Sequence, residues 1–215
     1  MKVGLLFDLD GTLLDTLGDL RNSVNAALCQ FGYPQRTLAE IRSFVGTGAR
    51  NLSRLSMPEG AENVDEVLAA FQAHYKDHCN IETGPYAGIP AALEALKDIP
   101  MAIVSNKPDY AVKELAAIYF PGIYARGESS DCPRKPAPDM LYKTLETLGV
   151  EKCVYVGDSD VDVLTATNAG APCLSVLWGF RDRDCIQAAG GKYFCEKAED
   201  MPAMLDQIVE EYYGK

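Results

Sequence analysis

Positively charged residues and histidines are scarce in this chain. Its 215 residues include 20 lysines and arginines against 31 aspartates and glutamates, so the formal net charge at pH 7 is −11. Nucleic-acid phosphates need a positive protein surface, so we expect no nucleic-acid partner. The only two histidines, His74 and His78, lie four residues apart, a spacing that could hold zinc on a helix. Because no third ligand beyond Cys79 is obvious, we interpret them as part of a solvated helix face.

Cysteine pairs and long apolar segments are also missing. The seven cysteines are an odd number without a CxxC pair, which indicates small core residues in a reducing compartment. No apolar run is long enough to span a bilayer, and the N-terminus enters a strand-like segment without the features of a signal peptide. We therefore expect a cytoplasmic protein, a monomer or weak homodimer, with no membrane partner.

The sequence does contain apolar runs that alternate with helical periodicities. Such strand-like runs occur at 2–7, 100–105, 122–126, 152–157 and 172–177. Continuous apolar strands that alternate with helices are typical of a parallel sheet covered on both faces. The predicted fold class is therefore α/β, with a Rossmann-like, doubly wound parallel sheet.

One interval interrupts this alternation. From 15–83 there is no strand signal, and apolar residues at helical spacing mark helices near 17–31 and 64–75, with a glycine-punctuated loop between them. We predict that this interval is an all-α cap domain. It would be inserted into a core domain made of residues 1–14 and 84–215.

Polar residues gather where the predicted strands end. In a doubly wound sheet, ligands bind at the carboxyl ends of the strands, so these residues are expected to meet at one edge. They are Asp8, Asp10, Ser105, Asn106, Lys107, Lys135, Asp158 and Asp162.

This set of side chains suits phosphoryl chemistry. Asp8, Asp10 and Asp158 would be costly together as bare charges, but they suit Mg²⁺, which prefers carboxylates, waters and a substrate phosphate. One carboxylate could attack phosphorus, and the other could protonate the leaving oxygen and then deprotonate water. Lys135 would offset charge on the phosphoryl oxygens, which the Ser105 hydroxyl would hold. The expected partner is a small phosphorylated metabolite.

Four segments in order, DLDGTLLDT, VSNK, RKPAP and GDSDVD, resemble the motifs of the haloacid dehalogenase superfamily of phosphatases. The predicted helical insertion resembles the cap of that superfamily. The resemblance implies that Asp8 is the nucleophile and Asp10 the general acid/base. It also implies Mg²⁺ held by Asp8, the Asp10 backbone carbonyl and Asp158, with Asp162 supporting the metal site.

The resemblance further implies that Ser105 and Lys135 bind the phosphate, and we expect Thr12 and Asn106 beside them to contact the substrate. Asp10 lies two residues after the implied nucleophile. In this feature the chain resembles the phosphatases of the superfamily rather than its dehalogenase branch, which lacks that aspartate.

Within the cap, Gly48 and Arg50 could offer a backbone N–H and a guanidinium to an anionic leaving group. A surface arginine in a cap helix is the alternative for Arg50. Near the C-terminal part of the core, Arg181 and Arg183 are most simply interpreted as solvated loop charges.

Longer stretches such as FVGTGARNL and ATNAGAPCLSVLWGFRD most resemble phosphoglycolate phosphatases. Pyrophosphatases and nucleotide or sugar-phosphate phosphatases are the alternatives, followed by a phosphomutase or a non-catalytic protein that binds phosphorylated ligands. Residues 17–24 lack the histidine that sugar phosphomutases carry in the first cap helix, which favours hydrolysis.

Overall fold

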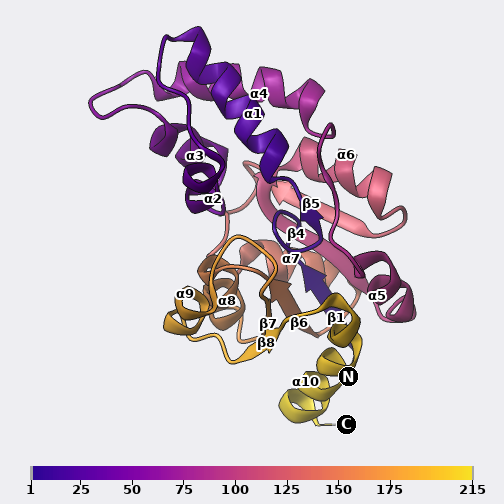
Figure 1. Ribbon diagram of the computed structural model, residues 1–215. Coiled ribbons are helices and arrows are strands. Elements are labelled where there is room, and N and C mark those ends of the chain that lie inside the picture. Colours follow the sequence, from indigo (N-terminus) through magenta and orange to yellow (C-terminus); the bar gives the residue numbers. More distant parts are fainter. Residues whose placement is uncertain (1, 215) are drawn as a thin grey trace.

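A six-stranded sheet forms the core of the computed structural model, which describes residues 2–214 (Figure 1). The strand order is β5-β4-β1-β6-β7-β8 and all neighbouring pairs are parallel, which confirms the predicted doubly wound α/β fold. The order reverses beside the central β1, where ligands bind in such sheets. The bounds are Val3–Phe7 (β1), Met101–Pro108 (β4), Tyr124–Glu128 (β5), Lys152–Gly157 (β6), Cys173–Val176 (β7) and Tyr193–Cys195 (β8).

Several strands differ from the sequence prediction, and β4 continues beyond the predicted 100–105 to Pro108. β5 begins at Tyr124 rather than at Gly122, because Gly122 lies in the turn after α6 with a positive φ of 91°. β8 was not predicted, and at three residues it is too short to give a clear strand pattern.

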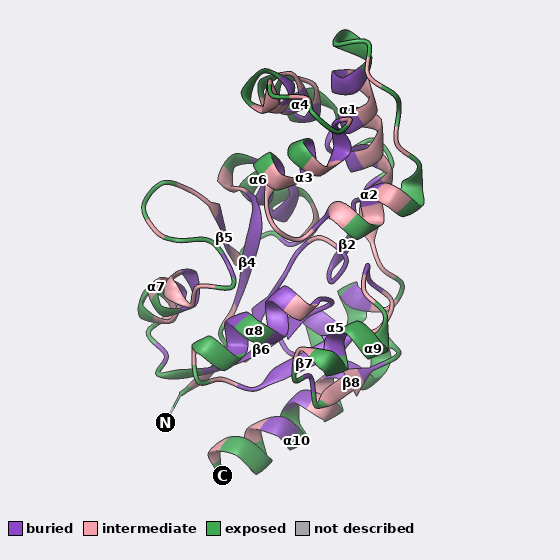
Figure 2. Cartoon of the chain, turned by 90° about the vertical axis from the view of Figure 1, so that its left-hand side faces the viewer, coloured by how far each residue is buried: buried purple, intermediate pink, exposed green. Residues whose placement is uncertain are grey.

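Helices cover both faces of the sheet, and the strands between them are buried (Figure 2). Leu5 and Phe7 of β1 belong to one apolar cluster and Leu6 to the other, because alternate side chains point to opposite faces. On the face of Leu5 lie α5 (Ile89–Ala95), α6 (Asp109–Tyr119) and α10 (Met201–Tyr213), the last preceded by a 3₁₀ turn, η1 (Ala198–Asp200). On the face of Leu6 lie α7 (Asp139–Leu148), α8 (Asp160–Asn168) and α9 (Arg183–Ala188).

The segment predicted as a cap contains four helices, which stand above the carboxyl ends of the strands (Figure 1). They are α1 (Leu17–Gln30), α2 (Leu38–Phe44), α3 (Ala49–Ser56) and α4 (Val64–His78). Val24 of α1 and Phe71 of α4 are buried in the same apolar cluster. None of the helices between residues 2 and 214 has the length and hydropathy that a bilayer crossing requires.

Two linkers join the cap to the core, and they lie side by side. Their ends pair as a short antiparallel ladder of β2 (Leu14–Asp15) and β3 (Gly84–Pro85). The carboxylate of Asp19 in α1, only 1% exposed, accepts hydrogen bonds from the three backbone N–H groups of residues 81–83 and from the Thr83 hydroxyl. One buried carboxylate therefore holds the returning linker against the first cap helix.

We expect Asp19→Ala to lower the free energy of unfolding by about 3 kcal/mol, because several donors of the linker would lose their acceptor. Urea denaturation measures this loss. Asp98→Ala, which removes an exposed carboxylate, is the control and should change stability little. Equal stability of the two variants would contradict a structural role for Asp19.

Candidate active site

The carboxyl ends of β1, β4 and β6 open into one pocket beneath the cap. From the core, the pocket is lined by both motif aspartates of β1, Asp8 and Asp10, and by Ser105 and Asp158. The cap contributes mainly apolar surface, including Leu20, Val45, Leu52 and Phe71. Polar groups of the core therefore face an apolar wall of the cap.

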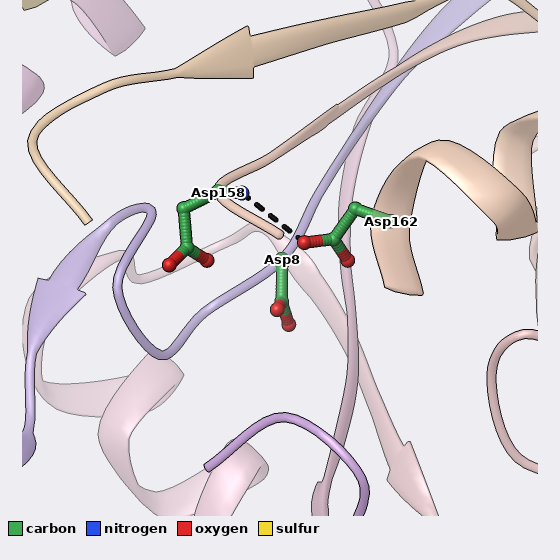
Figure 3. A group of neighbouring side chains, drawn as sticks. All are labelled: Asp8, Asp158 and Asp162. Atoms are coloured by element: carbon green, nitrogen blue, oxygen red, sulfur yellow. Dashed lines mark hydrogen bonds between the residues drawn. The ribbon is translucent and has the colours of Figure 1, made fainter. Parts of the chain in front are cut away.

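Three aspartates of the predicted site form a buried cluster. Carboxylate oxygens of Asp8, Asp158 and Asp162 all lie within 4.8 Å of one another, and Figure 3 shows Asp8 between the other two. Hard cations such as Mg²⁺ bind oxygen ligands of this kind. Of the three, Asp8 and Asp158 line the pocket, so they are the residues that could hold a metal ion in contact with a ligand.

Asp162 is fully engaged with the protein. Its Oδ1 accepts from Nζ of Lys135 at 2.8 Å, and its Oδ2 accepts from the N–H groups of Asp158 and Ser159 and from the Ser159 hydroxyl. Ser159 and Asp162 together form the capping box that begins α8. Asp162 therefore orients the turn after β6 rather than offering a free ligand atom, in keeping with the supporting role that the motif implies.

The cluster has more buried negative charge than its single lysine compensates. Burial raises the pKa of Asp8 to about 6, although Lys135 acts in the opposite direction. Burial, followed by the charges of Asp162 and Asp8, also raises the pKa of Asp158 well above its ordinary value. A bound cation would relieve this cost, because an opposite charge favours the ionised form of a carboxyl group.

Lys135 is the buried cation of the cluster. Its Nζ lies 3.1 Å from Asp8 Oδ1, 2.8 Å from Asp162 Oδ1 and 2.8 Å from the Tyr155 hydroxyl. Burial opposes the charge, but Asp162 and Asp8 raise the pKa of Lys135, so it remains protonated. Asn106 holds the backbone of Lys135, accepting from its N–H and donating to its carbonyl. Asn106 thus both lines the pocket and positions the lysine.

Asp10 is held through one oxygen. The Thr16 hydroxyl donates to Oδ1 at 2.7 Å, and Nζ of Lys107 donates to the same oxygen at 2.8 Å. Among residues 2–214, no hydrogen bond reaches Oδ2, which is therefore the oxygen available for proton exchange. The sequence analysis placed Lys107 at this edge of the sheet but gave it no catalytic or binding role. Its position directly after Ser105 and Asn106, at the end of a predicted strand, was the available signal.

Of the other residues predicted to contact the substrate, some line the pocket and others do not. The Ser105 hydroxyl lines the pocket and accepts a long hydrogen bond, 3.4 Å, from the backbone N–H of Lys107. Thr12 was expected to touch the substrate, but its hydroxyl donates to Asp158 Oδ1 at 3.1 Å. Gly48 lines the pocket, whereas Arg50 does not. The Arg50 guanidinium instead pairs with Asp65 at 3.0 Å, where both side chains are largely exposed, so Arg50 lies outside the pocket.

The interpretation of Arg181 as a solvated loop charge is wrong. Arg181 lines the pocket, and its guanidinium donates to backbone carbonyls at the end of α2 in the cap. Arg183, by contrast, is exposed and pairs with Glu196 at 3.2 Å. His74 and His78 stack on each other in α4, and within residues 2–214 they join no cluster of three metal-ligand side chains.

The Tyr155 hydroxyl supports the site from below, accepting from Lys135 and donating to the Val104 carbonyl at 2.7 Å. We expect Tyr155→Phe to lower the free energy of unfolding by about 1–2 kcal/mol, because two buried groups lose a partner. Tyr142→Phe is the matched control, since its hydroxyl is exposed and donates only at 3.4 Å. Urea denaturation compares the two variants, and equal losses would contradict the role given to Tyr155.

Comparisons with known proteins agree with this geometry. The family model described as haloacid dehalogenase-like hydrolase matches residues 5–176. The chain is 34% identical to a phosphoglycolate phosphatase of Aquifex aeolicus over 217 residues, covering 97% of this chain and 99% of that protein. It is 36% identical to a phosphoglycolate phosphatase of Rhodobacter capsulatus over 194 residues, covering 84% and 87%.

A similar crystal structure is that of a protein from Lactobacillus delbrueckii subsp. bulgaricus, provisionally named a phosphoglycolate phosphatase. It superimposes with a TM-score of 0.88 at 36% identity and covers 95% of this chain and 99% of its own. The family match extends over most of the chain and includes both β1 aspartates and the turn that holds Asp158 and Asp162. The chain belongs to the haloacid dehalogenase-like hydrolase family.

Proposed function

We propose that this protein is a phosphoric monoester hydrolase that cleaves a small phosphorylated metabolite through a phosphorylated Asp8, with phosphoglycolate as the first candidate substrate. The observation that carries the proposal is that Asp8 and Asp10 face one pocket together with Ser105 and the buried cation Lys135 behind Asp8. Relatives named phosphoglycolate phosphatase, which cover nearly the whole chain, support the choice of substrate.

Magnesium is the cofactor that the donor set fits. Asp8, Asp158 and the backbone carbonyl of Asp10 would hold it, and Asp162 would keep the turn of Asp158 in place. These are hard oxygen donors in a buried cluster with excess negative charge, as Mg²⁺ requires. When bound, the ion would offset the charge of the carboxylates and of the substrate phosphate.

The reaction proceeds in two displacements. Asp8 is oriented by the Leu9 N–H, which donates to Oδ1 at 2.8 Å, and by Lys135 on the same oxygen. Attack by the Asp8 carboxylate forms an O–P bond and breaks the P–O bond to the leaving group, which takes a proton from Asp10. Asp10 then removes a proton from water, and the water oxygen displaces Asp8 from phosphorus. Inorganic phosphate leaves, Asp8 is again a free carboxylate, and Asp10 again carries a proton, taken from water in place of the one that it gave to the leaving group.

The test is phosphate release from a panel of esters in the presence of Mg²⁺. We expect the highest kcat/KM for phosphoglycolate, compared with pyrophosphate, nucleotides and sugar phosphates. Asp8→Asn should lower kcat by about 10³-fold or more, because the amide cannot form the covalent intermediate. Asp98→Asn, which alters an exposed aspartate, is the control and should retain full activity.

Several outcomes would contradict the proposal. Full turnover by Asp8→Asn would exclude covalent catalysis by this residue, and turnover after exhaustive treatment with EDTA would exclude the need for magnesium. Saturable binding of esters without phosphate release would indicate a binding protein. Transfer of the phosphoryl group to a sugar, followed with labelled sugar phosphate, would indicate a mutase.

Lys107 should matter through Asp10. We expect Lys107→Met to reduce kcat by about 10²-fold, because the carboxylate of Asp10 loses the ammonium that orients it. Lys107→Arg keeps the charge and should retain more activity than Lys107→Met. Lys113→Met removes a comparable lysine–aspartate pair, with Asp109, from the surface of α6 and serves as control. A kcat for Lys107→Met equal to that of this control would refute the assignment.

A further inference from the structure

The loop after β7 touches both the cap and the acidic cluster, and the proposed reaction gives it no role. Its central residue is Arg181, whose Nη1 donates to the carbonyl of Arg42 at 2.8 Å. Its Nη2 donates to the carbonyls of Ser43 and Val45, at 3.2 and 2.6 Å. These carbonyls lie in the last turn of α2 and just beyond it, where backbone oxygens lack helical partners and favour a cation.

The cap also donates hydrogen bonds to the core. Nη2 of Arg42 donates to the carbonyl of Gly179 at 3.1 Å and lies 3.4 Å from Asp182 Oδ1. A second core side chain, Asn106, donates to the carbonyl of Gly46 at 3.0 Å. We call the reciprocal pair of Arg181 and Arg42 the arginine latch. Together with Asn106, the arginine latch holds the cap segment 42–46 against the core through main-chain atoms.

The same loop also holds the acidic cluster. The backbone N–H of Phe180, directly before Arg181, donates to Asp158 Oδ2 at 2.6 Å. Gly179 packs so closely on Asp158 and on the carbonyl of Gly11 that a Cβ at this position would overlap both. The segment 179–181 is therefore packed and hydrogen-bonded directly onto Asp158.

We propose that Arg181 is a positioning residue that keeps the cap loop 45–48 over the pocket and links cap closure to the carboxylate of Asp158. Opening the cap would break the hydrogen bonds of the Arg181 guanidinium. Arg181 would then keep only its contact with Asp160 of the core, 3.6 Å from Nε, and the less restrained segment 179–181 would hold the Asp158 carboxylate less firmly through the Phe180 N–H. The cap would thus form the closed pocket and help to order a metal-binding carboxylate in the same movement. The kinetic consequence of this proposal rests on the proposed function, and its link to metal binding rests on the magnesium site proposed there.

The first test is hydrogen–deuterium exchange on the full-length protein without substrate. Arg181→Met should speed the exchange of amides in residues 45–52 by about fivefold or more, because the cap loop loses its core donors. Arg181→Lys keeps the charge but lacks the several N–H donors of the guanidinium. Its rate of exchange should therefore lie between those of the wild-type protein and Arg181→Met. Arg183→Met, on the same loop but paired with Glu196, is the matched control and should leave this exchange unchanged. Equal exchange in Arg181→Met and Arg183→Met would overturn the latch.

The second test measures binding of Mg²⁺ alone by titration calorimetry. We expect the Kd of Arg181→Met to rise by about threefold or more, because Asp158 is less well ordered. An unchanged Kd would overturn the link to Asp158. Turnover of p-nitrophenyl phosphate should show a larger rise in KM than fall in kcat for Arg181→Met. If the wild-type protein hydrolysed no ester, the proposed function would fail, while exchange and metal binding would still decide the proposal about Arg181.

Discussion

Three carboxylates and one ammonium are buried together at the carboxyl ends of the central strands. The surrounding residues stabilise this excess of negative charge with hydrogen-bond donors. Both carboxylate oxygens of Asp162 accept hydrogen bonds, one from Lys135 and the other from the donors at the start of α8. Lys135 is in turn held by Tyr155, which the sheet buries completely. Bare carboxylates are expensive to bury, so the arrangement is stable only with paired donors and, when loaded, a cation.

The positions of the acidic residues were predictable because each follows an apolar strand, and parallel strands end at the same edge. Asp8, Ser105 and Asp158 therefore meet as the sequence predicts. The hydrogen-bond partners of the side chains were less predictable. Whether Lys107 turns toward Asp10, or Arg181 toward α2, depends on contacts between residues nearly 100 or more positions apart. The end of a predicted strand therefore indicates where a residue lies, but it does not indicate which residue its side chain contacts.

The cap is attached by interactions of two kinds. Near the linkers, the buried carboxylate of Asp19 fixes the returning chain to α1. At the far side, Arg181 and Asn106 bind carbonyl groups rather than cap side chains. Main-chain recognition leaves the side chains of the cap loop free to change without loss of docking.

The inner surface of the cap differs from the sequence expectation of a cap arginine at the site. The cap wall of the pocket is apolar at Leu20, Leu52 and Phe71, and Arg50, the cap arginine expected there, points away to Asp65. Positive charge near the pocket comes instead from Lys107 and Arg181, both of which belong to the core. An apolar cover lowers the local dielectric and strengthens every charge interaction beneath it. Both cations are already engaged, Lys107 with Asp10 and Arg181 with carbonyls of the cap, so the apolar wall strengthens the contacts that hold the site together.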